Sequence, residues 1–140
     1  MTTAAGDKRT GGCRCGAVRF VASGAPASVR ACHCSDCRKA SGAPYSVFVE
    51  YAEADIAWSG EIPSRFTVEA ASRSFCGMCG SPLAYRDSRL DSRVYLLIGA
   101  LDDPSGLSPS DHAFVQSKLD GVVIPEDVTL HERFSVTRPR

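Results

Sequence analysis

Short apolar runs bounded by glycine and proline recur along the chain, and they predict β-strands. One of the clearest is Tyr45–Tyr51, where Ser46 and Glu50 interrupt a run that contains Phe48. The other predicted strands are Ala17–Ala22, Ser28–Ala31, Asp55–Trp58, Arg65–Glu69, Arg73–Phe75, Pro82–Arg86, Arg93–Ile98, Ala113–Gln116 and Val128–Glu132. So many short strands favour an antiparallel all-β domain.

One short helix is predicted between Ser35 and Gly42. Ser35 can cap its start, Asp36 lies in its first turn, and Gly42 can end it. The positive end of its dipole would stabilise the neighbouring thiolates of Cys34 and Cys37.

The chain has 140 residues, of which 44% are hydrophobic, and this predicts one domain over residues 11–134. Residues 1–10 and 135–140 are polar, and we expect them to be flexible tails. The first of these segments lacks the apolar core of a signal peptide, and no segment approaches the roughly 20 apolar residues of a membrane span.

The formal net charge is zero, and the Arg and Lys residues are scattered singly. A nucleic-acid binder normally carries a basic face or run, so we expect neither nucleic acid nor a membrane among the partners. The thiols discussed next need a reducing compartment, which favours a cytoplasmic location.

Seven cysteines form the strongest chemical signal in the chain. They fall into three tight clusters, within the ranges Cys13–Cys15, Cys32–Cys37 and Cys76–Cys79. An odd number excludes complete internal disulfide pairing, and residues one or two apart rarely satisfy disulfide geometry. Thiolates at this spacing suit tetrahedral zinc instead. Seven ligands divide as four plus three, which predicts two zinc sites of different character: a closed structural site, and a site with one position open for a ligand.

The first and third clusters have similar glycine-flanked motifs. Joining Cys13 and Cys15 to Cys76 and Cys79 would close a four-thiolate structural site that contributes mainly to folding. Two alternatives remain open at this point: the four cysteines are simply buried thiols, or the Cys76 pair joins the second cluster.

The second cluster offers three ligands on one short segment: Cys32, Cys34 and Cys37. Three thiolates on a divalent zinc give a net charge of about minus one and leave one coordination position open. The negative charge weakens the zinc as a Lewis acid, so hydrolysis by metal-bound hydroxide is disfavoured. A soft thiol is the favoured ligand for the open position. We therefore predict that these three cysteines form the catalytic centre. Alternatives are a closed site with His33 as fourth ligand, and a metal-free redox relay.

The remaining histidines, His112 and His131, have no partner at ligand spacing in the sequence. We expect them to be ordinary polar side chains.

Five ordered motifs carry a resemblance that covers most of the chain. The segments Gly12–Phe20, Cys32–Lys39 and Arg73–Leu83, followed by Gly99–Pro104 and His112–Lys118, resemble the glutathione-dependent formaldehyde-activating enzyme family. The resemblance implies a β-tent fold built round a structural zinc, together with the four-plus-three division of the cysteines. It implies two zinc ions, a structural one held by Cys13, Cys15, Cys76 and Cys79 and a second, exchangeable one held by Cys32, Cys34 and Cys37. It also implies an activity that joins formaldehyde to the thiol of glutathione, classed as a carbon–sulfur lyase in the reverse direction.

The sequence departs from the family pattern after Ser117 and Lys118. The family usually carries a tryptophan shortly after this pair, whereas Leu119–Val122 has none. The departure predicts the loss of one aromatic wall of the ligand pocket and leaves the metal ligands unaffected.

The leading hypothesis is a zinc-dependent addition of a small thiol, such as glutathione, to formaldehyde or a related aldehyde. Arg14, Arg38 and Lys39 are candidate partners for the carboxylates of glutathione, and Asp36 is a candidate general base. Two alternatives are a non-catalytic carrier of glutathione, another thiol or zinc, and a zinc-ribbon interaction module. The B-type methionine sulfoxide reductases share related architecture, but they need a separate nucleophilic cysteine, and all seven cysteines here belong to clusters.

Overall fold

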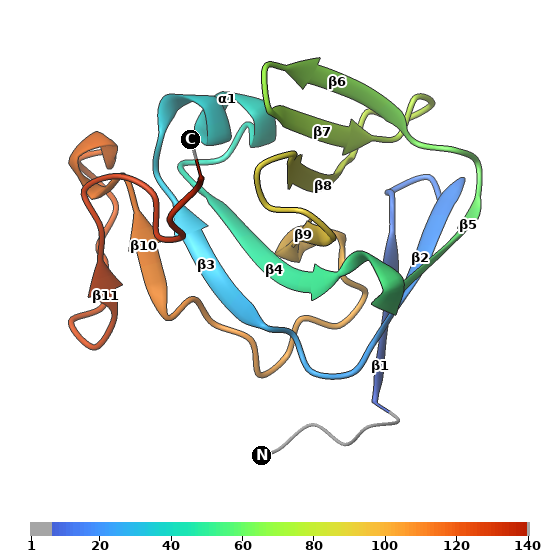
Figure 1. Ribbon diagram of the computed structural model, residues 1–140, viewed down its shortest axis with the longest axis horizontal. Coiled ribbons are helices and arrows are strands. Elements are labelled where there is room, and N and C mark those ends of the chain that lie inside the picture. The colour runs from blue at the N-terminus through green and yellow to red at the C-terminus, as the bar shows by residue number, and fades with distance from the viewer. Residues whose placement is uncertain (1–6, 140) are drawn as a thin grey trace.

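The computed structural model describes residues 7–139, and its strands form two sheets (Figure 1). The strands are β1 Lys8–Gly12, β2 Val18–Ser23, β3 Ser28–Cys32, β4 Ser46–Ala52, β5 Ile56–Gly60, β6 Ser64–Val68, β7 Ala71–Phe75, β8 Pro82–Asp87, β9 Arg93–Leu97, β10 Asp111–Ala113 and β11 Thr129–Leu130. The described residues also contain one α-helix, α1 Ser35–Ser41, and three 3₁₀ turns, η1 Glu53–Asp55, η2 Ile98–Ala100 and η3 Val115–Ser117. The predicted all-β fold class is confirmed.

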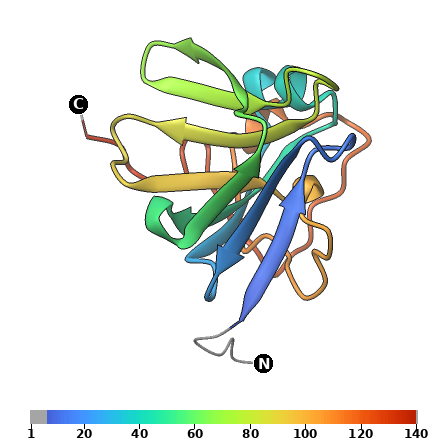
Figure 2. The same cartoon turned by 90° about the vertical axis from the view of Figure 1, so that its right-hand side faces the viewer.

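The smaller sheet has the order β1-β2-β5, and the larger one has the order β11-β10-β3-β4-β9-β8-β7-β6. Figures 1 and 2 show the smaller sheet beside the curved larger sheet, with α1 close to the β6–β7 hairpin in Figure 1. Most neighbouring strands are antiparallel, as expected, but β10 runs parallel to both β3 and β11. The expectation of a purely antiparallel arrangement was therefore wrong at this edge.

The main core fills the space between the two sheets. Side chains alternate between the two faces of a strand, and in β2 this alternation buries Val18, Phe20 and Ala22. They pack in one apolar cluster with residues of the larger sheet such as Leu83 and Leu96. This packing fixes the β1–β2 loop and the β7–β8 turn, and both carry cysteines.

Several local expectations need correction. Strand β1 begins at Lys8, inside the segment expected to be a tail, while residues 1–6 lie outside the described part of the chain. The expected strand Ala113–Gln116 is only partly extended, because η3 occupies residues 115–117. Cys34 rather than Ser35 is the N-cap of α1, since its sulfur accepts a hydrogen bond from the Cys37 N–H. Within residues 7–139, no helix is both long and apolar enough to cross a bilayer.

Candidate metal centres and an adjoining cavity

The first and third cysteine clusters meet in space. Cys13 and Cys15 lie in the loop between β1 and β2, and Cys76 and Cys79 lie in the turn between β7 and β8. The Sγ atoms of Cys13 and Cys15 are 3.5 Å apart, those of Cys15 and Cys76 are 3.8 Å apart, and all four sulfurs lie within 4.8 Å of one another. The structure thus brings together the four residues that the sequence analysis grouped.

Backbone N–H groups are directed at these sulfurs. Val18 N–H donates to Cys13 Sγ at 3.3 Å, and the Met78 and Cys79 N–H groups each donate to Cys76 Sγ at 3.4 Å. The bond from Val18 lowers the pKa of Cys13. Donors placed in this way stabilise the thiolate form, which is the form that binds metal.

The sulfur spacing of the four-cysteine cluster fits a tetrahedral ion. Zn–S bonds of about 2.3 Å in a regular tetrahedron place neighbouring sulfurs about 3.8 Å apart, close to the separations observed. The cluster could therefore hold a metal ion, and its geometry is consistent with zinc. Such a site would link the smaller sheet covalently to the larger one.

The second cluster is formed by the end of β3 and the start of α1. Cys32 is the last residue of β3, Cys34 caps the helix and Cys37 lies in its first turn. The three sulfurs lie within 4.8 Å of one another, so this cluster could also hold a metal ion. The pKa of Cys34 falls to about 2, because the thiols of Cys32 and Cys37 hydrogen-bond to its thiolate. The hydrogen bond to Cys34 raises the pKa of Cys32, so the negative charge concentrates on Cys34.

Arg73, on β7, contacts the three-cysteine cluster directly. Its Nη2 lies 3.6 Å from Cys37 Sγ, and its guanidinium carbon lies 5.1 Å from the centre of the Tyr85 ring. Arg73 belongs to one of the family-like motifs of the sequence, but no functional role was predicted for it. Its position shortly before Cys76 gives no sign of a contact with Cys37, which lies 36 residues earlier in helix α1.

His33 lies between two of these cysteines in the sequence, but its side chain contacts other residues. Its Nε2 is 2.9 Å from Nδ1 of His112, and its ring centre is 4.7 Å from that of Tyr45. Both histidines are buried, and neither belongs to the group of three sulfurs. His112 therefore has a specific buried partner, contrary to expectation, and His33 does not act as a fourth ligand in this arrangement.

A cavity of about 340 Å³ adjoins the three-cysteine cluster. Its floor is a row of side chains from five adjacent strands of the larger sheet: Arg30 on β3, Phe48 on β4, Tyr95 on β9, Tyr85 on β8 and Arg73 on β7. Strand register explains the row, because Arg30 pairs with Phe48, Tyr95 with Tyr85, and Tyr85 with Arg73. The floor of the cavity thus carries three aromatic rings between two arginines, and the three cysteines also line the cavity.

The charged groups of this cavity differ from those expected. Arg14, Arg38 and Lys39 are absent from its lining, so they are not placed to hold the carboxylates of a ligand there. Asp36 does line the cavity, but it is exposed. The arginines that line it are Arg30, Arg73, Arg89 and Arg138.

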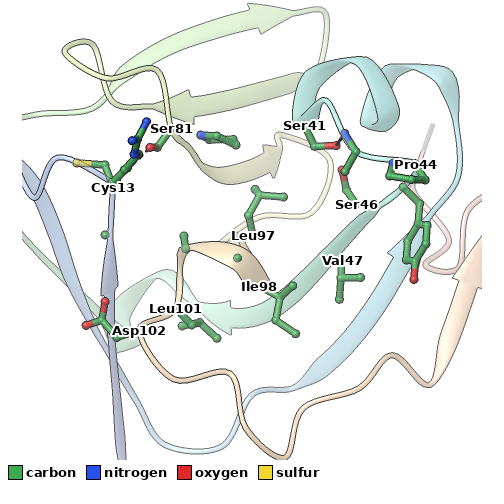
Figure 3. A pocket seen from close by; sticks show the side chains of 17 residues that line it. Cys13, Ser41, Pro44, Ser46, Val47, Ser81, Leu97, Ile98, Leu101 and Asp102 are labelled. Carbon is green, nitrogen blue, oxygen red and sulfur yellow. Dashed lines mark hydrogen bonds between the residues drawn. The ribbon is translucent and has the colours of Figure 1, made fainter.

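A larger cavity of about 820 Å³ lies elsewhere, and its lining includes only one cysteine, Cys13. Figure 3 shows Cys13 and Ser81 at one end, Pro44 at the other, and Leu97 and Ile98 between them. None of the three sulfurs of the second cluster lines it. This cavity therefore has apolar surface but little of the chemistry that the smaller one offers.

Comparisons with known proteins bear on the fold and the family of the chain. A crystal structure of a Rhodobacter sphaeroides protein is similar to the chain with a TM-score of 0.54 and 22% sequence identity, over 71% of this chain and 91% of that one. That likeness shows a shared fold. A search of curated proteins found no significant match. The sequence pattern of the glutathione-dependent formaldehyde-activating enzymes matches residues 8–117 and so includes all seven cysteines. The chain belongs to the glutathione-dependent formaldehyde-activating enzyme family.

Proposed function

We propose that the cavity beside Cys32, Cys34 and Cys37 binds a thiol, glutathione in the first instance, and promotes its addition to formaldehyde. In this reaction the sulfur forms a bond to the carbonyl carbon, and the thiol proton ends on the carbonyl oxygen. The product is S-hydroxymethylglutathione, and the reverse reaction breaks the same carbon–sulfur bond. One observation carries the proposal: Cys32, Cys34 and Cys37 form a group of their own, distinct from the four-cysteine cluster, and they line a cavity.

Two zinc ions would complete the protein in this proposal. Cys13, Cys15, Cys76 and Cys79 would hold the structural ion, and the three-cysteine cluster would hold the exchangeable one. Zinc bound to three thiolates would favour a soft sulfur ligand and stabilise its deprotonated form.

The residues around the cavity supply the remaining chemistry. The three thiols present ligands, and Arg73 places a positive charge beside Cys37. Burial raises the pKa values of Tyr85 and Tyr95, so both phenols remain protonated near neutral pH. The Tyr85 hydroxyl donates to Oδ2 of Asp87 at 3.4 Å, which makes Tyr95 the better candidate to donate a hydrogen bond to a ligand. A phenol or guanidinium donor would stabilise the negative oxygen that develops as sulfur adds to the carbonyl.

The test is the rate at which glutathione and formaldehyde exchange with their adduct, followed by NMR with and without the protein. The proposal expects faster exchange with the protein than with an equal concentration of zinc in buffer. Cys34→Ser should abolish the acceleration while leaving the four-cysteine cluster intact. Equal rates for the wild type and this variant would contradict the assignment of the site.

A second candidate is a carrier that binds a thiol or zinc without turnover. It is favoured by one observation: the groups seen to hydrogen-bond to these thiols from outside the cluster's own sulfurs are the Cys37 N–H and the Arg73 guanidinium, and neither is a base. A carrier needs no group that takes up the thiol proton. Tight binding of glutathione without faster adduct exchange would support the carrier and exclude the enzyme.

A further inference from the structure

The C-terminal segment Phe134–Arg138 crosses the three-cysteine cavity opposite its sheet floor. Phe134, Ser135, Val136 and Arg138 all line this cavity. These residues lie beyond the range 8–117 that matches the family pattern. The segment is therefore a feature of this chain that the family match does not account for.

Contacts along the larger sheet hold this segment in place. The Phe114 N–H donates to the carbonyl of Arg133 at 3.1 Å, and Nη1 of Arg30 donates to the carbonyl of Ser135 at 3.1 Å. Farther along, Nε of Arg138 donates to Oδ2 of Asp87 at 2.8 Å. Arg30 is on β3 and Asp87 ends β8, so the anchors lie on strands separated by β4 and β9. The segment thus spans the aromatic floor.

Asp87 is a strong anchor. Its side chain is fully buried, and it accepts hydrogen bonds from both Arg89 and Arg138. These guanidinium contacts, with that of Arg89 the strongest, lower the pKa of Asp87 and keep it ionised. A buried carboxylate shared by two arginines fixes Arg138, and with it the end of the segment.

Three side chains pack around Phe134, and part of its ring remains exposed. The Arg89 guanidinium carbon is the most distant of the three, 5.9 Å from the ring centre. The Arg138 guanidinium carbon lies 3.9 Å from the centre of the Phe134 ring, and the Phe114 ring meets it edge-on at 5.1 Å. The residue nevertheless remains 41% exposed. An ordered aromatic ring with free surface in the lining of a cavity offers a contact for a ligand at little entropic cost.

We propose that Phe134, positioned by Arg138, is a specificity-determining residue that makes this cavity select a thiol with a peptide-sized body over a minimal thiol. The inference rests on the proposed function, because it assumes that the ligand's sulfur binds at the three cysteines. The sulfur of any thiol reaches that cluster, but only a longer molecule extends beneath the C-terminal segment. Phe134 then contacts the non-reacting part of the thiol, where amide planes can stack on its ring.

The test is calorimetric binding of glutathione and of 2-mercaptoethanol to the metal-loaded protein. Phe134→Ala should weaken glutathione about tenfold, the loss expected for one aromatic contact, and leave 2-mercaptoethanol within about twofold. Arg138→Gln should have the same selective effect as Phe134→Ala, weakening the binding of glutathione but not that of 2-mercaptoethanol. Phe134→Tyr keeps an aromatic ring and should bind glutathione as tightly as the wild type. Leu130→Ala is the matched control, because Leu130 is an exposed apolar residue of the same C-terminal region outside the cavity lining.

Each outcome decides the matter. Equal weakening of both thiols by Phe134→Ala would show a general structural effect, and unchanged glutathione binding would show that the segment does not contact the ligand. Either result overturns the proposal. Selective weakening in a protein that does not accelerate adduct exchange would support Phe134 while refuting the enzymatic function. If the wild type binds neither thiol, both proposals are wrong.

Discussion

Nη2 of Arg73 lies 3.6 Å from Sγ of Cys37, within reach of a charge-assisted hydrogen bond to sulfur. Of the arginines that line the cavity, Arg89 and Arg138 pair with Asp87, and Arg30 lies 3.6 Å from Asp111. Arg73 has no ion-pair partner among the described residues. Its charge is therefore directed at the thiolates, whose complex with a divalent ion would carry a net charge of about minus one.

Replacing Arg73 by Gln should weaken metal binding at the three-cysteine cluster. Loss of a hydrogen bond to a metal ligand costs about 10- to 100-fold in metal affinity or activity. Competition between the protein and a coloured chelator would measure the change, with the four-cysteine cluster as the internal reference. Arg65→Gln removes a β6 arginine outside the cavity lining and should leave both affinities unchanged. An Arg73→Gln protein that binds metal as tightly as the wild type would show that the contact has no influence on the cluster.

The two cysteine clusters should respond differently to loss of one ligand. Cys76 is only 1% exposed and belongs to the main core, so Cys76→Ser should lower the free energy of unfolding by several kcal/mol through loss of the structural site. Cys34 is half-buried and caps a short helix. Because serine is itself a favourable N-cap, Cys34→Ser should lower that energy by no more than about 1 kcal/mol.

Metal analysis and chemical denaturation of both variants would check this contrast. Each variant should lose about one metal ion per chain, but only the Cys76 variant should unfold at clearly lower denaturant concentration. If Cys34→Ser unfolds the protein as severely, the three-cysteine cluster is structural and the proposed catalytic centre is wrong.

The buried histidine pair should make the protein less stable in mild acid. Burial lowers the pKa of His33 to about 4 from its ordinary 6.5, and burial also lowers that of His112. As the pH falls below 6.5 the unfolded chain takes up a proton at His33, whereas the folded protein does so only near pH 4. The free energy of unfolding should therefore fall by up to about 3 kcal/mol over this range.

NMR of the carbon-bound imidazole protons would test this directly, and we expect the His33 ring to stay neutral down to about pH 5. His33→Gln should reduce the pH dependence of unfolding relative to the wild type, which separates this effect from acid-induced metal loss. A His33 resonance that titrates near pH 6.5 would contradict the assignment.

Much of the fold and of the metal chemistry could be predicted, because it depends on local patterns. Most of the predicted strands overlap observed ones, and the helix ends at Gly42 in a left-handed cap as expected. Cysteine spacing and flanking glycines suggested the grouping of Cys13 and Cys15 with Cys76 and Cys79, since turns that direct two sulfurs at one ion have a recognisable local sequence.

Long-range packing produced the features that the sequence analysis missed. His33 and His112 are 79 positions apart, and nothing local to either residue signals that they stack. The contacts of Arg138 likewise depend on the position of Asp87, 51 residues earlier. A polar C-terminus looks like a solvated tail in the sequence, because a stretch with few apolar residues gives no sign that specific ion pairs will order it.

Gly60, at the end of β5, requires glycine for two reasons, and its replacement should be costly. Its φ is +79°, a left-handed conformation, and a Cβ built there would lie 2.2 Å from the Ala17 carbonyl oxygen. Gly24 has a similar φ of +82° but has no atom within 4 Å of such a Cβ. Gly24→Ala should therefore cost about 1 kcal/mol, the conformational penalty alone, and Gly60→Ala should cost clearly more. Denaturant unfolding of the two variants measures the difference. Equal losses would mean that the β2–β5 pairing relaxes around the added methyl group, so that the edge of the smaller sheet is less rigid than its register implies.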